Sequence, residues 1–160
     1  MTLTLTRKVT ETSAVALPID ATALLPENFA TKSLAEISQM SIQSGNAEVP
    51  LSELFEIVGD PGDCSLQLRG DLSALHRLGR NMSRGEIVAH GSVGKHAGSR
   101  MTGGSLTIEG DADNWLGAEM RGGSIHVRGN VGNCVGGAYP GSTQGMNRGT
   151  ILVAGDCRHE

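Results

Sequence analysis

Apolar and polar residues alternate in short runs through the last hundred residues of the chain. The segments SLTIE (105–109) and SIHVR (124–128) place an apolar side chain at every second position. This alternation is typical of a strand with one buried face. A glycine follows each segment directly, which leaves no room for a hairpin within it. The pattern therefore predicts short strands that pair with strands elsewhere in the chain.

These strands recur with a period of 19 residues. Met82, Met101 and Met120 are one period apart, and Met146 follows after 26 residues because the segment GGAYPGSTQG (136–145) contains an insertion. At fixed offsets from each Met come glycines and apolar strand residues. One apolar column holds Ile87, Leu106, Ile125 and Ile151, and the next holds Ala89, Ile108, Val127 and Val153. A fainter copy of the same pattern occupies residues 64–72.

The repeat predicts an all-β fold. A chain that repeats strand, turn, short strand and turn can satisfy its backbone hydrogen bonds by stacking each coil on the last, about 4.8 Å apart. We therefore predict a right-handed single-stranded parallel β-helix of about 19-residue coils. The right-handed form follows the usual crossover preference. A left-handed hexapeptide helix is disfavoured because 19 is not a multiple of six.

The first sixty residues have a different pattern. Leu3 and Leu5 fall on one side of a short strand, and Ser33 with Glu36 forms a capping box before a short helix in which Leu34, Ile37 and Met40 face inward. Residues 50–60 are expected to form a turn and a strand. We predict a small α+β N-terminal cap (1–60) that covers the first coil of a β-helix repeat domain (61–160). The sequence stops just after the fourth-coil strand, so we expect the repeat domain to be truncated at its C-terminus; the alternative is a partner subunit over the open end.

Composition narrows the class of protein. The net charge of −4 argues against nucleic-acid binding, and no apolar run suits a signal peptide or a membrane span, so we expect a soluble, cytoplasmic protein. The chain has 23 glycines and three cysteines without CxxC spacing. We interpret Cys64, Cys134 and Cys157 as buried free thiols rather than a disulfide or a zinc site.

No set of residues stands out as a catalytic, cofactor-binding or metal site. His96, Trp115 and Cys134 share one column, which we interpret as packing. The acidic column contains Asp71, Asp111, Asn130 and Asp156. It is expected to bond turn amides, and the alternative is a carboxylate group that serves a stand-alone β-helix enzyme.

The insertion 136–145 is the one break in the repeat. It is expected to extrude Tyr139 and Pro140 from a regular wall. It is either a tolerated surface loop or a docking contact for another subunit.

The repeat units also resemble a known family. MTGGSLTIEGDADNWLGAEMRGGSIHVRGN (101–130) and VGGAYPGSTQGMNRGTILVAGD (135–156) resemble the C subunit of formylmethanofuran dehydrogenase and the matching subunit of the bacterial formyltransferase/hydrolase complex. Both belong with the GXGXG β-helix domain at the C-terminus of the glutamate synthase large subunit. The resemblance covers residues 50–156. Family members continue for several more coils, which favours truncation here.

The resemblance implies a role in one-carbon metabolism related to methanogenesis. The chain would be a non-catalytic β-helix subunit that holds together the subunits interconverting a formyl carrier and formate. In the archaeal oxidoreductase complex, those partners carry a molybdenum or tungsten pterin and a binuclear metal centre, and the carrier is of the methanofuran type. We favour the bacterial, non-redox complex, because the sequence gives no sign of redox-cofactor handling. A detached β-helix domain of a glutamate-synthase-like amidotransferase is the remaining alternative.

Overall fold

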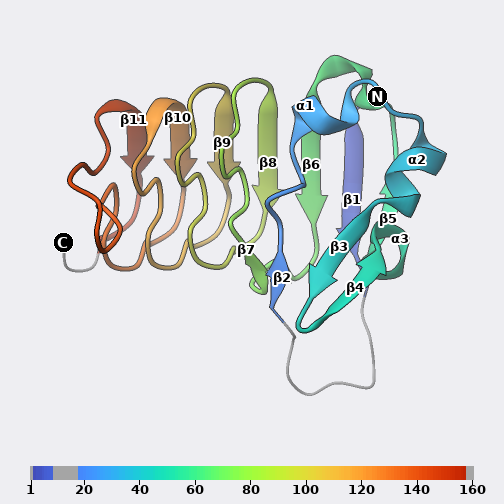
Figure 1. Ribbon diagram of the computed structural model, residues 1–160, viewed down its shortest axis with the longest axis horizontal. Helices are drawn as coiled ribbons and strands as arrows, with labels where there is room; N and C mark the ends of the chain where they lie inside the picture. Colours follow the sequence, from blue (N-terminus) through green and yellow to red (C-terminus); the bar gives the residue numbers. More distant parts are fainter. Residues whose placement is uncertain (1, 9–17, 158–160) are drawn as a thin grey trace.

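The computed structural model describes residues 2–8 and 18–157, and it is mostly β with few helices (Figure 1). A seven-stranded sheet has the strand order β11-β10-β9-β8-β6-β1-β5. Its strands are β1 (Leu3–Arg7), β5 (Phe55–Val58), β6 (Ser65–Arg69), β8 (Glu86–His90), β9 (Ser105–Ile108), β10 (Arg121–Val127) and β11 (Arg148–Val153). A four-stranded sheet has the order β4-β3-β2-β7. Its strands are β2 (Ile19–Asp20), β3 (Ser41–Ser44), β4 (Ala47–Pro50) and β7 (Leu75–His76).

The 19-residue period is also the register of the strands. Leu106 pairs in parallel with Ile87 on one side and with Ile125 on the other. Ile125 in turn pairs with Ile151 across the insertion. The predicted stacking of equivalent residues is therefore confirmed. The sheets as a whole are mixed, because β5 pairs antiparallel to β1, and β3 pairs antiparallel to both β2 and β4.

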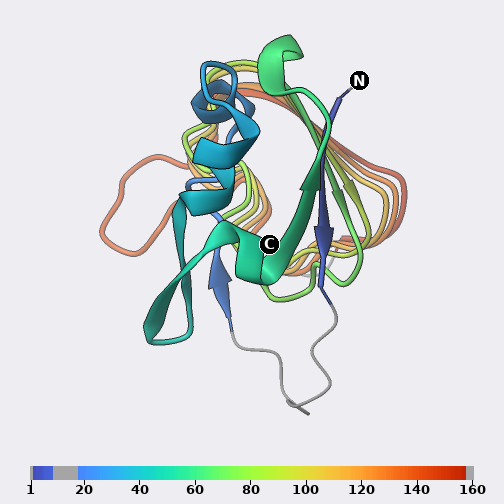
Figure 2. The same ribbon diagram turned by 90° about the vertical axis from the view of Figure 1, so that its right-hand side faces the viewer.

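Inward-facing side chains that recur with the 19-residue period form the core of the stacked coils. Met82, Met101 and Met120 are fully buried one above another. In the last described coil Met146, Ile151 and Val153 are only partly buried. The ladder thus runs through the stack, and its side chains become more exposed at the coil that contains β11. Figure 2 shows the coils one behind another around this core.

The first strand extends the repeat sheet. β1 pairs in parallel with β6, which places Leu3 beside Leu66 and Leu5 beside Leu68. Both leucines of β1 are fully buried. β1 therefore behaves like one more rung, although its sequence shows no repeat. The sequence predicted its apolar face but not its partner.

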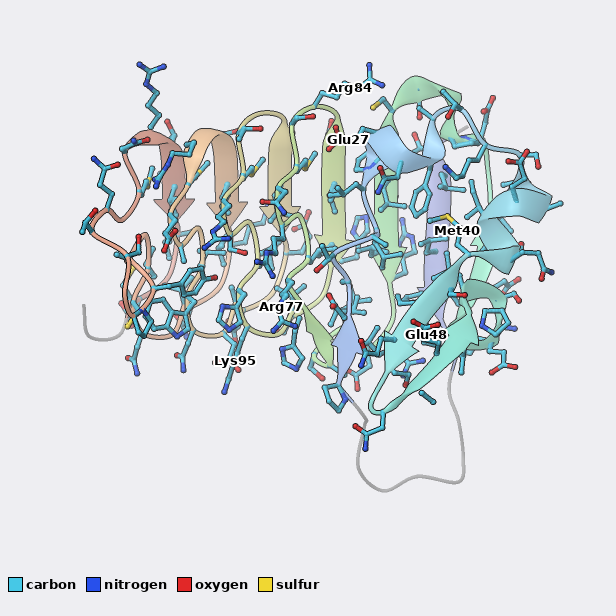
Figure 3. All side chains as sticks on the ribbon, viewed as in Figure 1. Glu27, Met40, Glu48, Arg77, Arg84 and Lys95 are labelled. Atoms are coloured by element: carbon cyan, nitrogen blue, oxygen red, sulfur yellow. The ribbon has the colours of Figure 1, made fainter. Side chains whose placement is uncertain are left out.

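Three helices lie next to these first rungs: α1 (Pro26–Phe29), α2 (Leu34–Gln39) and α3 (Leu51–Leu54), with a 3-10 turn at Pro61–Asp63. Glu27 of α1 accepts a hydrogen bond from the Ser83 N–H at 3.0 Å, which ties this helix to a coil (Figure 3). Phe29 is fully buried and belongs to the same core cluster as the repeat residues. One continuous core therefore joins the N-terminal residues to the coils.

The N-cap half of the predicted capping box is confirmed. The Ser33 hydroxyl accepts the Glu36 N–H at 3.2 Å at the start of α2. Ile37 is fully buried as expected, but Leu34 is 40% exposed and does not face the core. Helical side chains lean toward the helix N-terminus, so that of Leu34, the first helical residue, extends beyond the packed turn. Residues 51–54, expected to form a turn, instead form α3.

Candidate docking site

The base of the insertion loop (136–145) packs onto the side of the coils through Tyr139, while residues 140–144 are exposed. The Tyr139 ring lies 5.1 Å from Trp115 and 5.4 Å from His96, measured between ring centroids. The Tyr139 hydroxyl is 2.8 Å from His96 Nδ1. The expectation that Tyr139 projects was wrong, because a neighbouring aromatic surface lets the ring bury its area while its hydroxyl stays hydrogen-bonded. Pro140 is exposed, as expected.

Glu119 and Arg100 fix the base of the loop. The Glu119 carboxylate accepts the Tyr139 N–H at 2.9 Å and lies 3.4 Å from Arg100 Nε. The Arg100 guanidinium sits 5.7 Å from the centroid of the Tyr139 ring. The hydrogen bond from Tyr139 lowers the pKa of Glu119, burial opposes this, and Arg100 lowers it further. Glu119 therefore stays ionised at neutral pH and keeps its hydrogen bond to the loop backbone.

The loop is closed at its neck and turned sharply at its tip. Met146 donates its N–H to the Gly136 carbonyl at 2.8 Å, and Arg121 donates to the Gly145 carbonyl at 2.7 Å. At the tip, Ser142 N–H donates to the Tyr139 carbonyl at 2.9 Å. Pro140 and Gly141, the latter with φ of +88°, are the central residues of this turn. This is the sequence signature of a type II turn.

The wall beneath Tyr139 is a column of left-handed residues. His96 and Trp115 have φ of 64° and 66°, and their rings stack 6.3 Å apart at 7°. The interpretation of this column as packing holds for these two residues. Burial lowers the pKa of His96, and the nearby cations Arg77, Arg80 and Lys95, together with His76, lower it further. His96 is therefore neutral at physiological pH.

Sequence analysis missed the contribution of Arg100 and Glu119. A signal was present, because the two residues are opposite in charge and one period apart. Glu109 and Arg128 are also one period apart and form an ion pair at 3.1 Å. Opposite charges at the repeat spacing could have predicted both contacts.

The acidic column bonds to the backbone of neighbouring coils. Asp111 accepts the Asn130 N–H at 2.8 Å, and the Asn130 side chain accepts the Asp156 N–H at 2.9 Å. Asp71 instead accepts the N–H and hydroxyl of Ser73 within its own turn. These contacts support the structural interpretation of the column. Within residues 2–8 and 18–157, no cluster of three His, Cys, Asp or Glu side chains could hold a metal ion.

A second column of side chains that accept backbone N–H groups of the next coil begins at His76. Its Nδ1 accepts the Lys95 N–H at 2.9 Å, and Asn114 Oδ1 accepts the Asn133 N–H at 2.8 Å in the same column. Burial lowers the pKa of His76, Lys95 and Arg77 lower it further, and Asp113 and Asp20 oppose the shift. Arg77 and Lys95 lie together on this edge of the coils (Figure 3). The neutral imidazole is therefore built into the ladder.

This ladder predicts loss of stability in mild acid. A His whose folded pKa is lowered takes up its proton first in the unfolded chain, so stability is full above pH 6.5 and falls as the pH drops toward the folded value. Replacing His76 with Asn keeps an acceptor for Lys95 and removes the titration. We expect the melting temperature of H76N to fall less between pH 7 and pH 5 than that of the parent chain. An equal fall in melting temperature between pH 7 and pH 5 in both proteins would refute this expectation.

The cysteines are free but not buried. Cys64 and Cys134 are half-buried and Cys157 is exposed. The expectation of burial was wrong because none of the three occupies an inward strand position; Cys64 and Cys134 lie at left-handed corners, with φ of 55° and 62°. Among the described residues, no helix is long and apolar enough to cross a membrane.

Fold and site together define a class of protein: a stack of coils in which several polar side chains accept backbone N–H groups of the next coil, and from which one braced loop departs.

No family model matches the chain. It is 41% identical over 87 residues to the C subunit of the molybdenum-containing formylmethanofuran dehydrogenase 1 of Methanosarcina barkeri, a stretch covering 52% of this chain and 29% of the relative. Identity to the C subunit of the tungsten-containing formylmethanofuran dehydrogenase 2 of Methanothermobacter thermautotrophicus is 38% over 87 residues, covering 52% and 32%.

A solved structure extends the similarity to nearly the whole chain. The crystal structure of the formyltransferase/hydrolase complex FhcABCD of Methylorubrum extorquens with methylofuran contains a chain that matches with a TM-score of 0.87 at 27% identity. The match covers 96% of this chain and 56% of that chain. The resemblance indicated by the repeats is confirmed. The matched stretch spans about a third of the length of these curated relatives.

Proposed function

We propose that this chain is a non-catalytic subunit of a complex that handles formylmethanofuran or a related formyl carrier. Its job is to hold together the subunits that interconvert the carrier-bound formyl group and formate. The observation that carries the proposal is the match over 96% of the chain to a chain of the FhcABCD complex, together with its sequence identity to the C subunits of two dehydrogenases. The relatives are named as molybdenum- or tungsten-containing enzymes. In this proposal, such a metal pterin, or a binuclear metal centre, belongs to partner subunits.

The side-chain chemistry supports a scaffold. Two acids of the column accept backbone N–H groups: Asp111 from Asn130, and Asp71 from Ser73. The ion pairs Arg100–Glu119 and Glu109–Arg128 join successive coils. Such contacts fix the shape of a surface, which is what a subunit that positions others requires.

The proposal includes a finer description of the fold. The parallel register at one period favours a right-handed parallel β-helix over residues 61–160, with residues 1–60 as a cap over its first coil. The partly exposed Ile151 and Val153 favour a further layer over β11, supplied by more coils or by a partner. We place the complex in the cytoplasm and prefer its non-redox form, since the solved structure that matches is a formyltransferase/hydrolase complex.

Co-purification tests this function. The natural protein, tagged and expressed at its own level in the cells that encode it, should bring down a metallohydrolase-like subunit and a formyltransferase or metal-pterin subunit in fixed ratio. Recovery of the chain alone would overturn the proposal. A glutamate-synthase-like chain in their place would identify it as a detached amidotransferase domain.

A further inference from the structure

We propose that the insertion loop is a preformed docking element whose uncharged tip, residues 140–144, seats in an uncharged concave surface of a neighbouring subunit. This inference rests on the proposed function and deepens it, because it names the contact and the chemistry of the surface that receives it.

The loop is braced before any partner arrives. Tyr139 contributes three of the contacts at its base: to His96, to Trp115 and, through its N–H, to Glu119. Arg121 holds the far end of the loop through the Gly145 carbonyl at 2.7 Å. A loop that is already ordered loses little conformational entropy on binding, so most of its contact energy goes into association.

The wall that holds Tyr139 is kept in a disfavoured backbone conformation. His96 and Trp115 have φ of 64° and 66°, a region that L side chains adopt reluctantly. Glycine, of which the chain has 23, would fit these corners without strain. Arg77 and Cys134 in the same column share this conformation, so the left-handed corner belongs to the repeat. What distinguishes His96 and Trp115 is the ring that each presents to Tyr139 at the base of the loop.

The tip differs from its base. Residues 140–144 are all exposed, and the loop stands out to one side of the stacked coils, where Figure 2 draws it in orange. No charged residue occurs between Arg128 and Arg148. An uncharged turn can enter a pocket without stripping water from a charge. A pocket lined with charges would lose their hydration against this tip and gain no ion pair, so the receiving surface is uncharged.

The outer face of the seven-stranded sheet is a poorer candidate. It carries Arg69, Glu109 and Arg128 on or directly beside neighbouring strands. Thr107 lies at its middle and pairs with Val88 and His126. A position on this face therefore serves as a matched control for one at the loop tip.

The experiment is site-directed photocross-linking in the assembled complex. A benzoylphenylalanine is placed at position 143 or at position 107 of the natural protein, the complex is purified, and it is irradiated. We expect position 143 to cross-link to a partner subunit, and position 107 to do so much less.

Substitutions measure the same contact quantitatively. Thr143→Asp puts a charge in the tip without touching its base and should weaken association with the isolated partner at least about tenfold. Tyr139→Ala keeps the tip but removes the ring contacts at the base of the loop. It should weaken association with the partner about five- to tenfold, because the loop is no longer held in its bound conformation. Thr107→Asp should have no effect. A cooperative melting transition in each variant shows that it is folded; that of Thr107→Asp is expected at a somewhat lower temperature, because Thr107 lies inside a strand, where Asp is disfavoured.

Two outcomes overturn the inference, and they are distinguishable. If the complex assembles while position 143 cross-links to nothing and Thr143→Asp binds like the parent, the loop is a surface decoration and the proposed function survives. If the parent chain forms no complex, the proposed function fails and this inference with it.

Discussion

Ile125→Ala is expected to lower the free energy of unfolding by about 3 kcal/mol, and Ile151→Ala by about half as much or less. Both residues occupy the same column, on β10 and β11, and pair directly with each other. Ile125 is 1% exposed with a coil on either side, whereas Ile151 is only partly buried. The first truncation opens a closed cavity, while the second leaves a space that water already reaches. The difference between the two variants therefore measures how well the ladder is covered.

Urea unfolding of the two variants measures this difference. The slope m should stay constant while the midpoint shifts, because the change is in stability alone. Equal losses in both variants would show that Ile151 is as well covered as Ile125, and a loss below about 1 kcal/mol for Ile125→Ala would show that its side chain is not packed in the ladder.

Gly104→Ala is the second change with a large expected effect. Gly104 has φ of +78°, and a Cβ there would lie 2.7 Å from the Gly85 carbonyl oxygen and 2.9 Å from the Met82 side chain. The carbonyl belongs to the coil beneath and cannot move without breaking its ladder. We expect a loss of about 3 kcal/mol or more from strain and collision together.

Gly141→Ala is the matched control for this change. Gly141 has φ of +88°, but a Cβ there would meet nothing within 4 Å. Only the backbone strain of about 1 kcal/mol remains. Thermal or urea unfolding separates the two variants. If Gly141→Ala destabilised the protein as much as Gly104→Ala, the coils would not approach each other as closely at Gly104 as described.

The repeat made the coils predictable from the sequence. Each column samples one environment several times, so that Met82, Met101 and Met120 report the same buried position. A single five-residue strand shows only once which of its positions are apolar, whereas four aligned strands show the same apolar positions four times. This is why the register of Leu106 with Ile87 and Ile125 followed directly from the spacing.

The unrepeated parts were harder to predict. Leu3 and Leu5 indicated a buried face, but nothing in the sequence indicated a parallel partner some sixty residues away in β6. Tyr139 meets His96 at a separation of 43 residues, which is no multiple of the period. The insertion that carries Tyr139 breaks the alignment on which the prediction depended. Contacts of this kind depend on the loop path, which the repeat does not determine.

The formyl-conversion rate of the assembled complex carrying Asp111→Asn, a change within the acidic column, tests the central claim most directly. Asn130 already accepts a neighbouring N–H in the column of Asp111, so the substitution keeps the ladder and removes the charge. A scaffold predicts a rate per complex within about twofold of the parent, at an unchanged melting temperature. A catalytic carboxylate predicts a loss of roughly a hundredfold or more, and that loss would contradict the account.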